Sequence, residues 1–195
     1  MDGQARGRLM RIDGVDIHID GEGDEVVVMI HGWPDTWRLW DAQVRALTLH
    51  RRCVRFTLPG FDIAGPRRAH SMRELIGFFE KVVEAVSPGR PDTMARWLRV
   101  PSDMKDSGSC MNYPYYIQWT GTHGSYRQLA AVNPSCPMLF VFGRRKPVLF
   151  HAPAWADRLA ARPGSRVLAM DTRHWVMQEQ PEAVNAAVLD WLGLR

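Results

Sequence analysis

This sequence of 195 residues has few cysteines, no long apolar run and only a small net charge. The three cysteines, Cys53, Cys110 and Cys136, are unevenly spaced and indicate neither a disulfide framework nor a zinc site. Cysteine usage of this kind is typical of a reducing compartment. We therefore expect a cytoplasmic protein without a metal site. We also expect that the protein uses no cofactor.

The sequence also lacks an apolar run of the roughly 18 residues that a membrane-spanning helix needs. Its N-terminal segment, MDGQARGRLM, has no apolar core of the kind found in secretory signals. The net charge is only +4 and the basic residues are scattered, which argues against a nucleic-acid partner. We expect neither a membrane nor a nucleic acid as partner.

Hydrophobic residues make up 46% of the sequence and aromatic residues 10%, which is enough for one compact core. Short β-rich runs and amphipathic segments along the chain predict an α/β fold. Strands are expected at 8–12, 15–20, 25–30, 52–58, 138–142 and 167–170. The pair Asp13-Gly14 favours a hairpin turn between the first two, and 26–30 should lie next to 52–58. Helices are expected at 37–49, 72–86, 153–161 and 182–192. The first should place Trp37, Trp40, Val44 and Leu47 on one apolar face, and Ser71 should cap the second.

The segment at 25–36, EVVVMIHGWPDT, carries the strongest functional signal. Its apolar run is too short for an ordinary helix and rich in β-branched residues, so it predicts a buried strand. Gly32 and Pro34 then favour a tight turn that ends strand pairing. Backbone N–H groups in such a turn point into a crevice at the end of the strand, where they can stabilise a developing oxyanion.

This segment resembles the His-Gly-x-Pro oxyanion loop of the α/β-hydrolase family, in particular the branch of epoxide hydrolases and haloalkane dehalogenases. Further segments match in family order: RCVRFTLPGFD at 52–62, PMLFVFG at 137–143 and DTRHWVMQEQP at 171–181. The resemblance implies a mostly parallel sheet with flanking helices. It also implies hydrolysis of an ester, an epoxide or a related small hydrophobic substrate.

The same resemblance implies roles for individual residues. It places His31, Gly32, Trp33 and Pro34 in the oxyanion loop and gives His174 the role of general base. His31 has an alternative role as a structural histidine whose ring fastens the loop, and this choice stays open.

The family's nucleophile elbow, Gly-x-Ser-x-Gly or the same turn with aspartate, is absent from the sequence. Ser109 and Ser125 come closest, but neither follows a strand pattern, and Cys110 has no adjacent cation to lower its thiol pKa. The acid of the family commonly follows the penultimate strand, where this chain has Lys146, which cannot accept a hydrogen bond from a histidine. Nucleophile and acid are therefore both unassigned.

The residues at 92–133 resemble the family's helical cap. The cap aromatics either line the substrate pocket or pack the cap onto the body: Tyr113, Tyr115, Tyr116 and Trp119. The simplest account is a fold lacking its central strands, lost near residue 91, which divides the chain into core segments 1–91 and 134–195 around a cap remnant. The loss predicts direct pairing of 138–142 with 26–30, with His31 and His174 at one sheet edge.

These features leave two hypotheses for what the chain does. One is a hydrolase with His174 as base. The other is a catalytically incompetent variant or isoform that lacks its nucleophile and has a non-enzymatic or binding role, or no function. Whether the chain is an enzyme is left open by the sequence.

Overall fold

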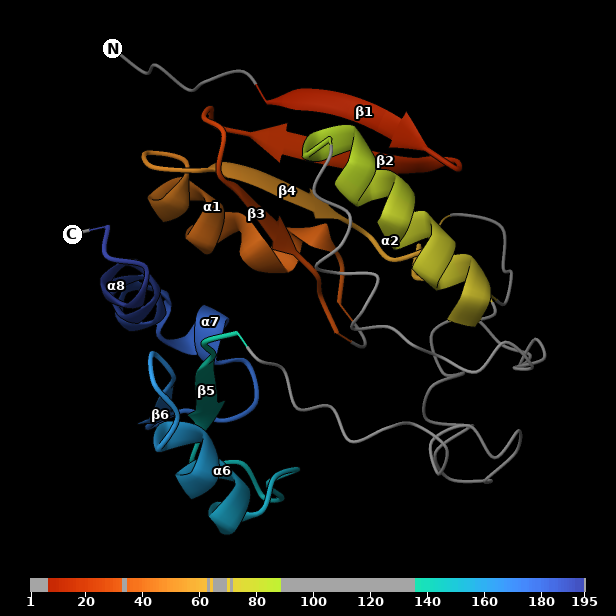
Figure 1. Cartoon of the computed structure of the whole chain (residues 1–195). Helices are drawn as coiled ribbons and strands as arrows, with labels where there is room; N and C mark the ends of the chain where they lie inside the picture. Colours follow the sequence, from red (N-terminus) through yellow and green to blue (C-terminus); the bar gives the residue numbers. More distant parts are fainter. Residues whose placement is uncertain are drawn as a thin grey trace. The chain divides into compact units, whose positions relative to one another are not determined.

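The computed structural model describes residues 7–32, 35–62, 64, 70, 72–88 and 136–194. The chain forms two compact units, each built from two stretches of sequence. The first unit comprises Met1–Arg38 and Arg51–Asn133, and the second comprises Leu39–His50 and Pro134–Arg195. Each unit has its own β-sheet, as the ribbon shows (Figure 1).

The sheet of the first unit has the strand order β1 (Arg8–Ile12), β2 (Val15–Asp20), β4 (Arg52–Phe56) and β3 (Val26–Met29). The β1–β2 hairpin turns at Asp13 and Gly14, both with positive φ, which confirms the turn predicted from the Asp-Gly pair. Strands β3 and β4 are parallel, with Val28 opposite Val54. The predicted neighbourhood of these two strands is confirmed.

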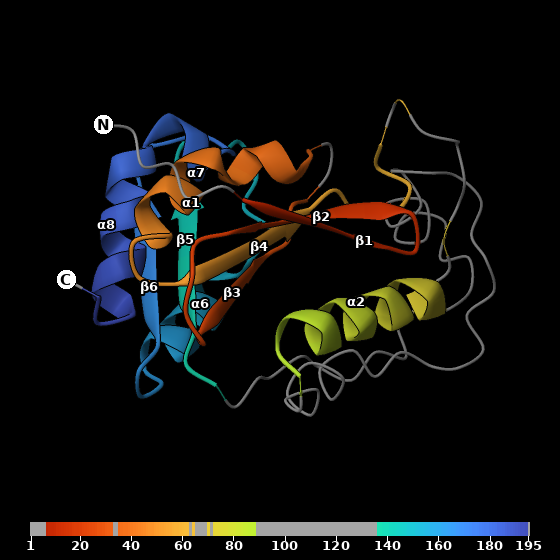
Figure 2. The ribbon, with the colours of Figure 1, turned by 90° about the horizontal axis from the view of Figure 1, so that it is seen from above.

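Helix α2 (Met72–Val86) packs its apolar face on this sheet (Figure 2). Phe78, Val82 and Val86 recur at every fourth position, so they lie on one side of the helix. They are buried with sheet residues that include Ile17 and Phe56, and the Phe56 and Phe78 rings meet edge to face at 5.2 Å. The predicted cap of this helix, Ser71, lies outside the described residues.

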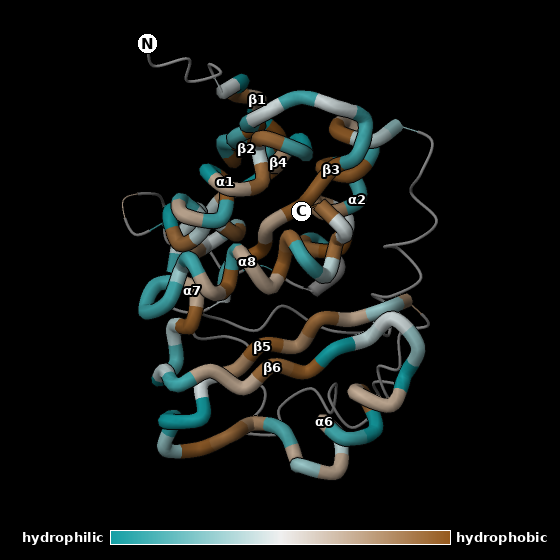
Figure 3. The backbone as a smooth tube through the Cα atoms, turned by 90° about the vertical axis from the view of Figure 1, so that its left-hand side faces the viewer, coloured by the Kyte–Doolittle hydropathy of each residue, from teal (hydrophilic) through white to brown (hydrophobic). Residues whose placement is uncertain are grey.

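The second unit holds the parallel pair β5 (Leu139–Gly143) and β6 (Arg166–Met170). Helix α6 (Pro153–Ala160) contacts β6, whereas α7 (Val176–Glu179) and α8 (Pro181–Trp191) contact β5. Figure 3 shows α6 and α8 on opposite sides of the two apolar strands. The predicted elements of this region are confirmed, and the short helix α7 is an addition to them.

A helical segment from earlier in the chain completes the second unit. It consists of the second half of the 3₁₀ turn η1 (Trp37–Trp40), from Leu39 on, and of helix α1 (Asp41–Leu47). The Asn185 side-chain amide donates to the Ala42 carbonyl at 3.1 Å, and that of Gln43 donates to the Met177 carbonyl at 3.3 Å. These bonds join α1 to α7 and α8.

The predicted place of Trp37 on the apolar face of this helix is wrong. Its indole belongs to the first unit, where it stacks on His18 with ring centroids 4.0 Å apart. The Arg55 guanidinium lies 4.6 Å from the same ring. Because Trp37 falls in the 3₁₀ turn before α1, it does not follow the spacing of the α-helix that buries Val44 and Leu47.

The predicted pairing of 138–142 with 26–30 would join the two units, so it stays a prediction, as does the placing of His31 and His174 at one sheet edge. Within the described residues of each unit, β3 pairs with β4 and β5 pairs with β6.

Parallel and antiparallel pairings both occur, and helices flank the sheets, so the predicted α/β class is confirmed. None of the helices that the structure describes combines the length and apolar character needed to cross a membrane.

Candidate functional site

The loop after β3 is fastened by His31, whose side chain is buried. The backbone N–H of Leu58, just beyond β4, donates to Nε2 of the ring at 2.9 Å. Because Nε2 must then carry a lone pair, the proton resides on Nδ1, which donates to the Gly32 carbonyl at 2.8 Å. Both ring nitrogens are therefore engaged by backbone groups in the neutral tautomer.

Burial lowers the pKa of His31 below its ordinary value of 6.5, against smaller raising effects of the Gly32 carbonyl and Asp35. The ring also meets Phe61 edge to face at 5.3 Å. These contacts support the fastening role of His31 rather than proton transfer. Trp33 and Pro34 lie outside the described residues, so an oxyanion loop at this point stays a prediction.

In the second unit, the loops that follow β5 and β6 are held together by backbone hydrogen bonds. The N–H of Arg144 donates to the Met170 carbonyl at 2.9 Å, and the N–H of Arg145 donates to the Thr172 carbonyl at 3.0 Å. Gly143 makes this approach feasible, since a Cβ atom there would overlap the Arg173 carbonyl and lie 2.5 Å from that of Thr172.

His174 lies in the loop after β6 and is solvent-exposed. The residue before it is anchored, because the N–H of Arg173 donates to both carboxylate oxygens of Glu179 at 3.0 and 3.1 Å. Glu179 also lies 3.9 Å from the guanidinium of Arg145, which in turn approaches Asp171 at 3.6 Å. A short network of charges thus fixes the backbone next to His174.

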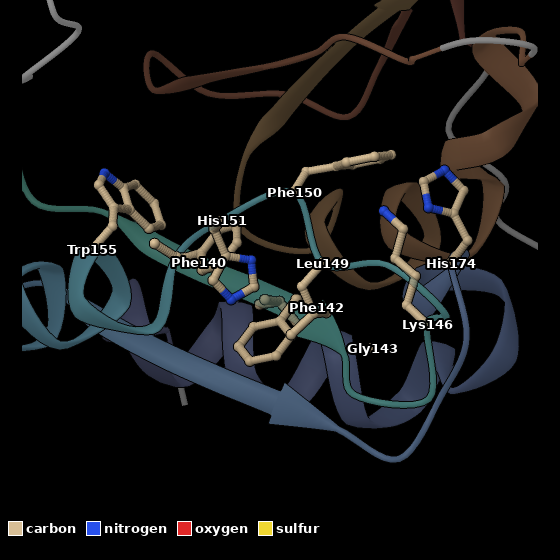
Figure 4. Close-up of a pocket in the computed structure, with 11 residues that line it drawn as sticks. Phe140, Phe142, Gly143, Lys146, Leu149, Phe150, His151, Trp155 and His174 are labelled. Carbon is tan, nitrogen blue, oxygen red and sulfur yellow. The ribbon is translucent and has the colours of Figure 1, made fainter.

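His174 lines a cavity of about 590 Å³ with mostly apolar walls (Figure 4). Phe140 and Phe142 come from β5 and Trp155 from α6, while the intervening loop adds Leu149, Phe150 and His151. The rings meet edge to face, for example Phe140 with Trp155 at 5.0 Å. Figure 4 shows Lys146 and His174 together at the end away from Trp155.

Lys146 occupies the position from which the resemblance expects an acid. Its Nζ lies 3.8 Å from the centroid of the Phe150 ring, a cation–π contact. Partial burial lowers the pKa of its ammonium group. The neighbour of His174 at this end of the cavity is therefore a hydrogen-bond donor and not the carboxylate of a triad.

The wall residues of this cavity were not predicted from the sequence as a ligand site. A signal was present, because Phe140 and Phe142 alternate along β5 and so project to one side of the sheet. The predicted pocket residues Tyr113, Tyr115, Tyr116 and Trp119 lie outside the described residues. So do the nucleophile candidates Ser109, Cys110 and Ser125.

No cluster of three or more His, Cys, Asp or Glu side chains suited to a metal ion occurs within the ranges that the structure describes.

No protein-family model matches the sequence. Proteins named probable oxidoreductase EphD, from Mycobacterium tuberculosis and Mycobacterium bovis, are 35% identical over 85 residues. The match covers 40% of this chain but only 14% of the relatives, so the chain corresponds to a small part of their length.

Solved structures match the fold nearly from end to end. Epoxide hydrolase A from Mycobacterium thermoresistibile has a TM-score of 0.63 at 18% identity, covering 95% of this chain and 97% of the other. The enol-lactonase from Burkholderia xenovorans LB400 has a TM-score of 0.57 at 16% identity, covering 95% of this chain and 100% of the other. Epoxide hydrolase VrEH1 from Vigna radiata has a TM-score of 0.57 at 16% identity, covering 97% of this chain and 98% of the other. The chain therefore has the α/β-hydrolase fold.

Proposed function

We propose that this chain is a hydrolase of the α/β-hydrolase fold that cleaves an ester, an epoxide or a related small hydrophobic substrate, with His174 as general base. The observation that carries the proposal is the position of His174 at the rim of an apolar cavity, in the loop that follows a parallel strand. Ligands of α/β sheets bind beyond the carboxyl ends of such strands. The similar structures named above as epoxide hydrolases and an enol-lactonase support this choice of chemistry.

In the proposed reaction, the imidazole of His174 accepts a proton from the attacking nucleophile and returns it to the leaving oxygen. Lys146 lines the same cavity and cannot orient the imidazole by accepting its N–H. Loss of the orienting acid lowers kcat by about 10⁴ in a serine triad. We therefore expect turnover that depends on His174 but is slow.

The test is hydrolysis of p-nitrophenyl acetate and of styrene oxide by the full chain and by His174→Ala. His50→Ala is the matched control, since His50 is another exposed histidine of the second unit and does not line the cavity. We expect the wild type and His50→Ala to exceed the buffer rate equally, and His174→Ala to fall to it. Circular dichroism should show that both variants remain folded.

A rate that His174→Ala leaves unchanged would contradict the proposal. It would favour instead the incompetent variant that binds without turnover. A fluorophosphonate probe and iodoacetamide, followed by peptide mapping, would show whether Ser109, Ser125 or Cys110 supplies the nucleophile.

The cytoplasmic location, and the expectation that neither nucleic acid nor membrane is a partner, remain predictions from composition.

A further inference from the structure

The cavity of the second unit combines apolar walls with a cationic end. Its described lining includes Lys146, His151 and His174 but neither aspartate nor glutamate. The acids nearest to His174 in sequence, Asp171 and Glu179, are engaged by Arg144, Arg145 and the Arg173 N–H. A ligand in this cavity therefore meets positive charge that the lining itself does not neutralise.

Lys146 differs from the two arginines that precede it. Arg144 and Arg145 lie 3.4 and 3.6 Å from the Asp171 carboxylate. Within the part of the chain that the structure describes, Lys146 forms no such ion pair, and its Nζ rests on the Phe150 ring instead. That ring is 80% exposed, whereas Lys146 itself is half-buried and lines the cavity.

The remainder of the cavity suits a flat or short apolar body. Its wall presents ring edges and faces of Phe140, Phe142 and His151. The ring centroids of Phe142 and His151 lie 4.5 Å apart, and the two ring planes meet at 66°. Trp155 lies at the end away from Lys146 and His174. A volume of about 590 Å³ accommodates a small organic molecule whose apolar part leaves water on binding.

We propose that this cavity binds a small amphiphilic carboxylate, with the carboxylate at Lys146 and an aryl-alkyl body against Phe140 and Trp155. The inference rests on the proposed function for the location of the site and names the class of ligand that the site selects. An ammonium–carboxylate hydrogen bond at the edge of an apolar wall is stronger than its neutral counterpart. Lys146 thus becomes a specificity determinant at the position where the resemblance expects an acid.

The test compares two probes of nearly equal shape, 4-phenylbutyrate and 4-phenylbutyramide, by isothermal titration calorimetry with the full chain. We expect the carboxylate to bind about tenfold more tightly than the amide, as a hydrogen bond to a charged group implies. Lys146→Gln should reduce this preference to less than about twofold, whereas Lys146→Arg should keep most of it.

Lys81→Gln is the matched control for the change in net charge, because Lys81 pairs with Asp13 in the first unit and lies outside the cavity. It should leave the preference unchanged. Equal binding of both probes, no binding of either, or a preference that survives Lys146→Gln would each overturn the inference.

Binding is measured without turnover, so the two proposals can fail separately. A chain that prefers the carboxylate but hydrolyses nothing keeps this inference and loses the proposed function. A chain that hydrolyses esters through His174 but shows no preference between the probes keeps the function and loses the inference.

Discussion

The imidazole of His31 accepts the backbone N–H of Leu58 at 2.9 Å and so ties the end of β3 to the end of β4. The same ring donates through Nδ1 to the Gly32 carbonyl, which leaves it no nitrogen for an additional proton. Protonation would replace an acceptor by a second donor facing the Leu58 N–H.

Stability should therefore decrease in acid. Because burial depresses the folded-state pKa of His31 below 6.5, the unfolded chain takes up the proton first as the pH falls. The contribution of neutral His31 to the free energy of unfolding is complete above about pH 6.5. It is lost as the pH falls from there through the lower folded-state pKa of this residue. Urea unfolding from pH 8 to pH 5 measures the slope.

His31→Asn should flatten this pH dependence. The substitution should not abolish the pH dependence, because burial also lowers the pKa of His18 and so also reduces stability in acid. An unchanged slope in His31→Asn would show that the ring does not bridge the two loops in solution. His50→Ala, an exposed histidine, provides the control.

Replacement of Gly143 by alanine should destabilise the second unit. The added Cβ would overlap the Arg173 carbonyl, which is backbone and cannot rotate away, so we expect a loss of about 1 to 3 kcal/mol. Gly77→Ala is the matched control, because Gly77 is within α2 and a Cβ there meets nothing within 4 Å. That change should stabilise by about 0.5 to 1 kcal/mol. Equal urea midpoints for the two variants would contradict the close approach.

Two adjacent phenylalanines should differ sharply in their contribution to the core. Phe78 is 2% exposed within the α2–sheet core, whereas Phe79 is only partly buried against it. We expect Phe78→Ala to cost about 3 to 5 kcal/mol and Phe79→Ala clearly less.

The sequence also predicts marginal stability, a shallow unfolding transition and binding of a dye for exposed apolar surface, because central strands are expected to be missing. On that basis Phe78→Ala should lose its calorimetric transition, while Phe79→Ala keeps one. A sharp transition at high temperature in the wild type would contradict the expected marginality.

Cys53 and Cys136 should differ in reactivity towards iodoacetamide. Burial, with a further contribution from Asp20, raises the pKa of the Cys53 thiol to about 11. Cys136 is exposed. At pH 8 in native buffer, mass spectrometry should find Cys136 alkylated and Cys53 protected, and urea should remove the difference. Rapid native labelling of Cys53 would show that β4 opens readily.

The first unit could be predicted closely from sequence because its signals are local. Asp13 and Gly14 specify a hairpin turn through their own backbone preferences, and the apolar run at 26–30 is too short for a helix. Helix α2 followed from apolar residues at helical spacing. Each of these signals depends on neighbours within a few positions.

Sequence reasoning failed where the outcome depends on packing. The indole of Trp37 stacks on His18 of β2, a contact that the spacing of apolar residues along its own segment does not reveal. Helix α7 is only one turn long, too short to produce a detectable periodicity. The role of His174 as base was predicted from the family resemblance, whereas the aromatic wall beside it required the fold to bring β5 and α6 together.

The bond between Ala42 and Asn185 spans 143 positions of sequence, which has a consequence for the order in which the protein is made. The ribosome releases α1 long before α8 exists, so Val44 and Leu47 emerge with their partner helix still unsynthesised. Until translation is nearly complete, this apolar face is available to chaperones or to aggregation. Premature termination anywhere before α8 would leave a product whose earliest helix can never be covered by its native partner.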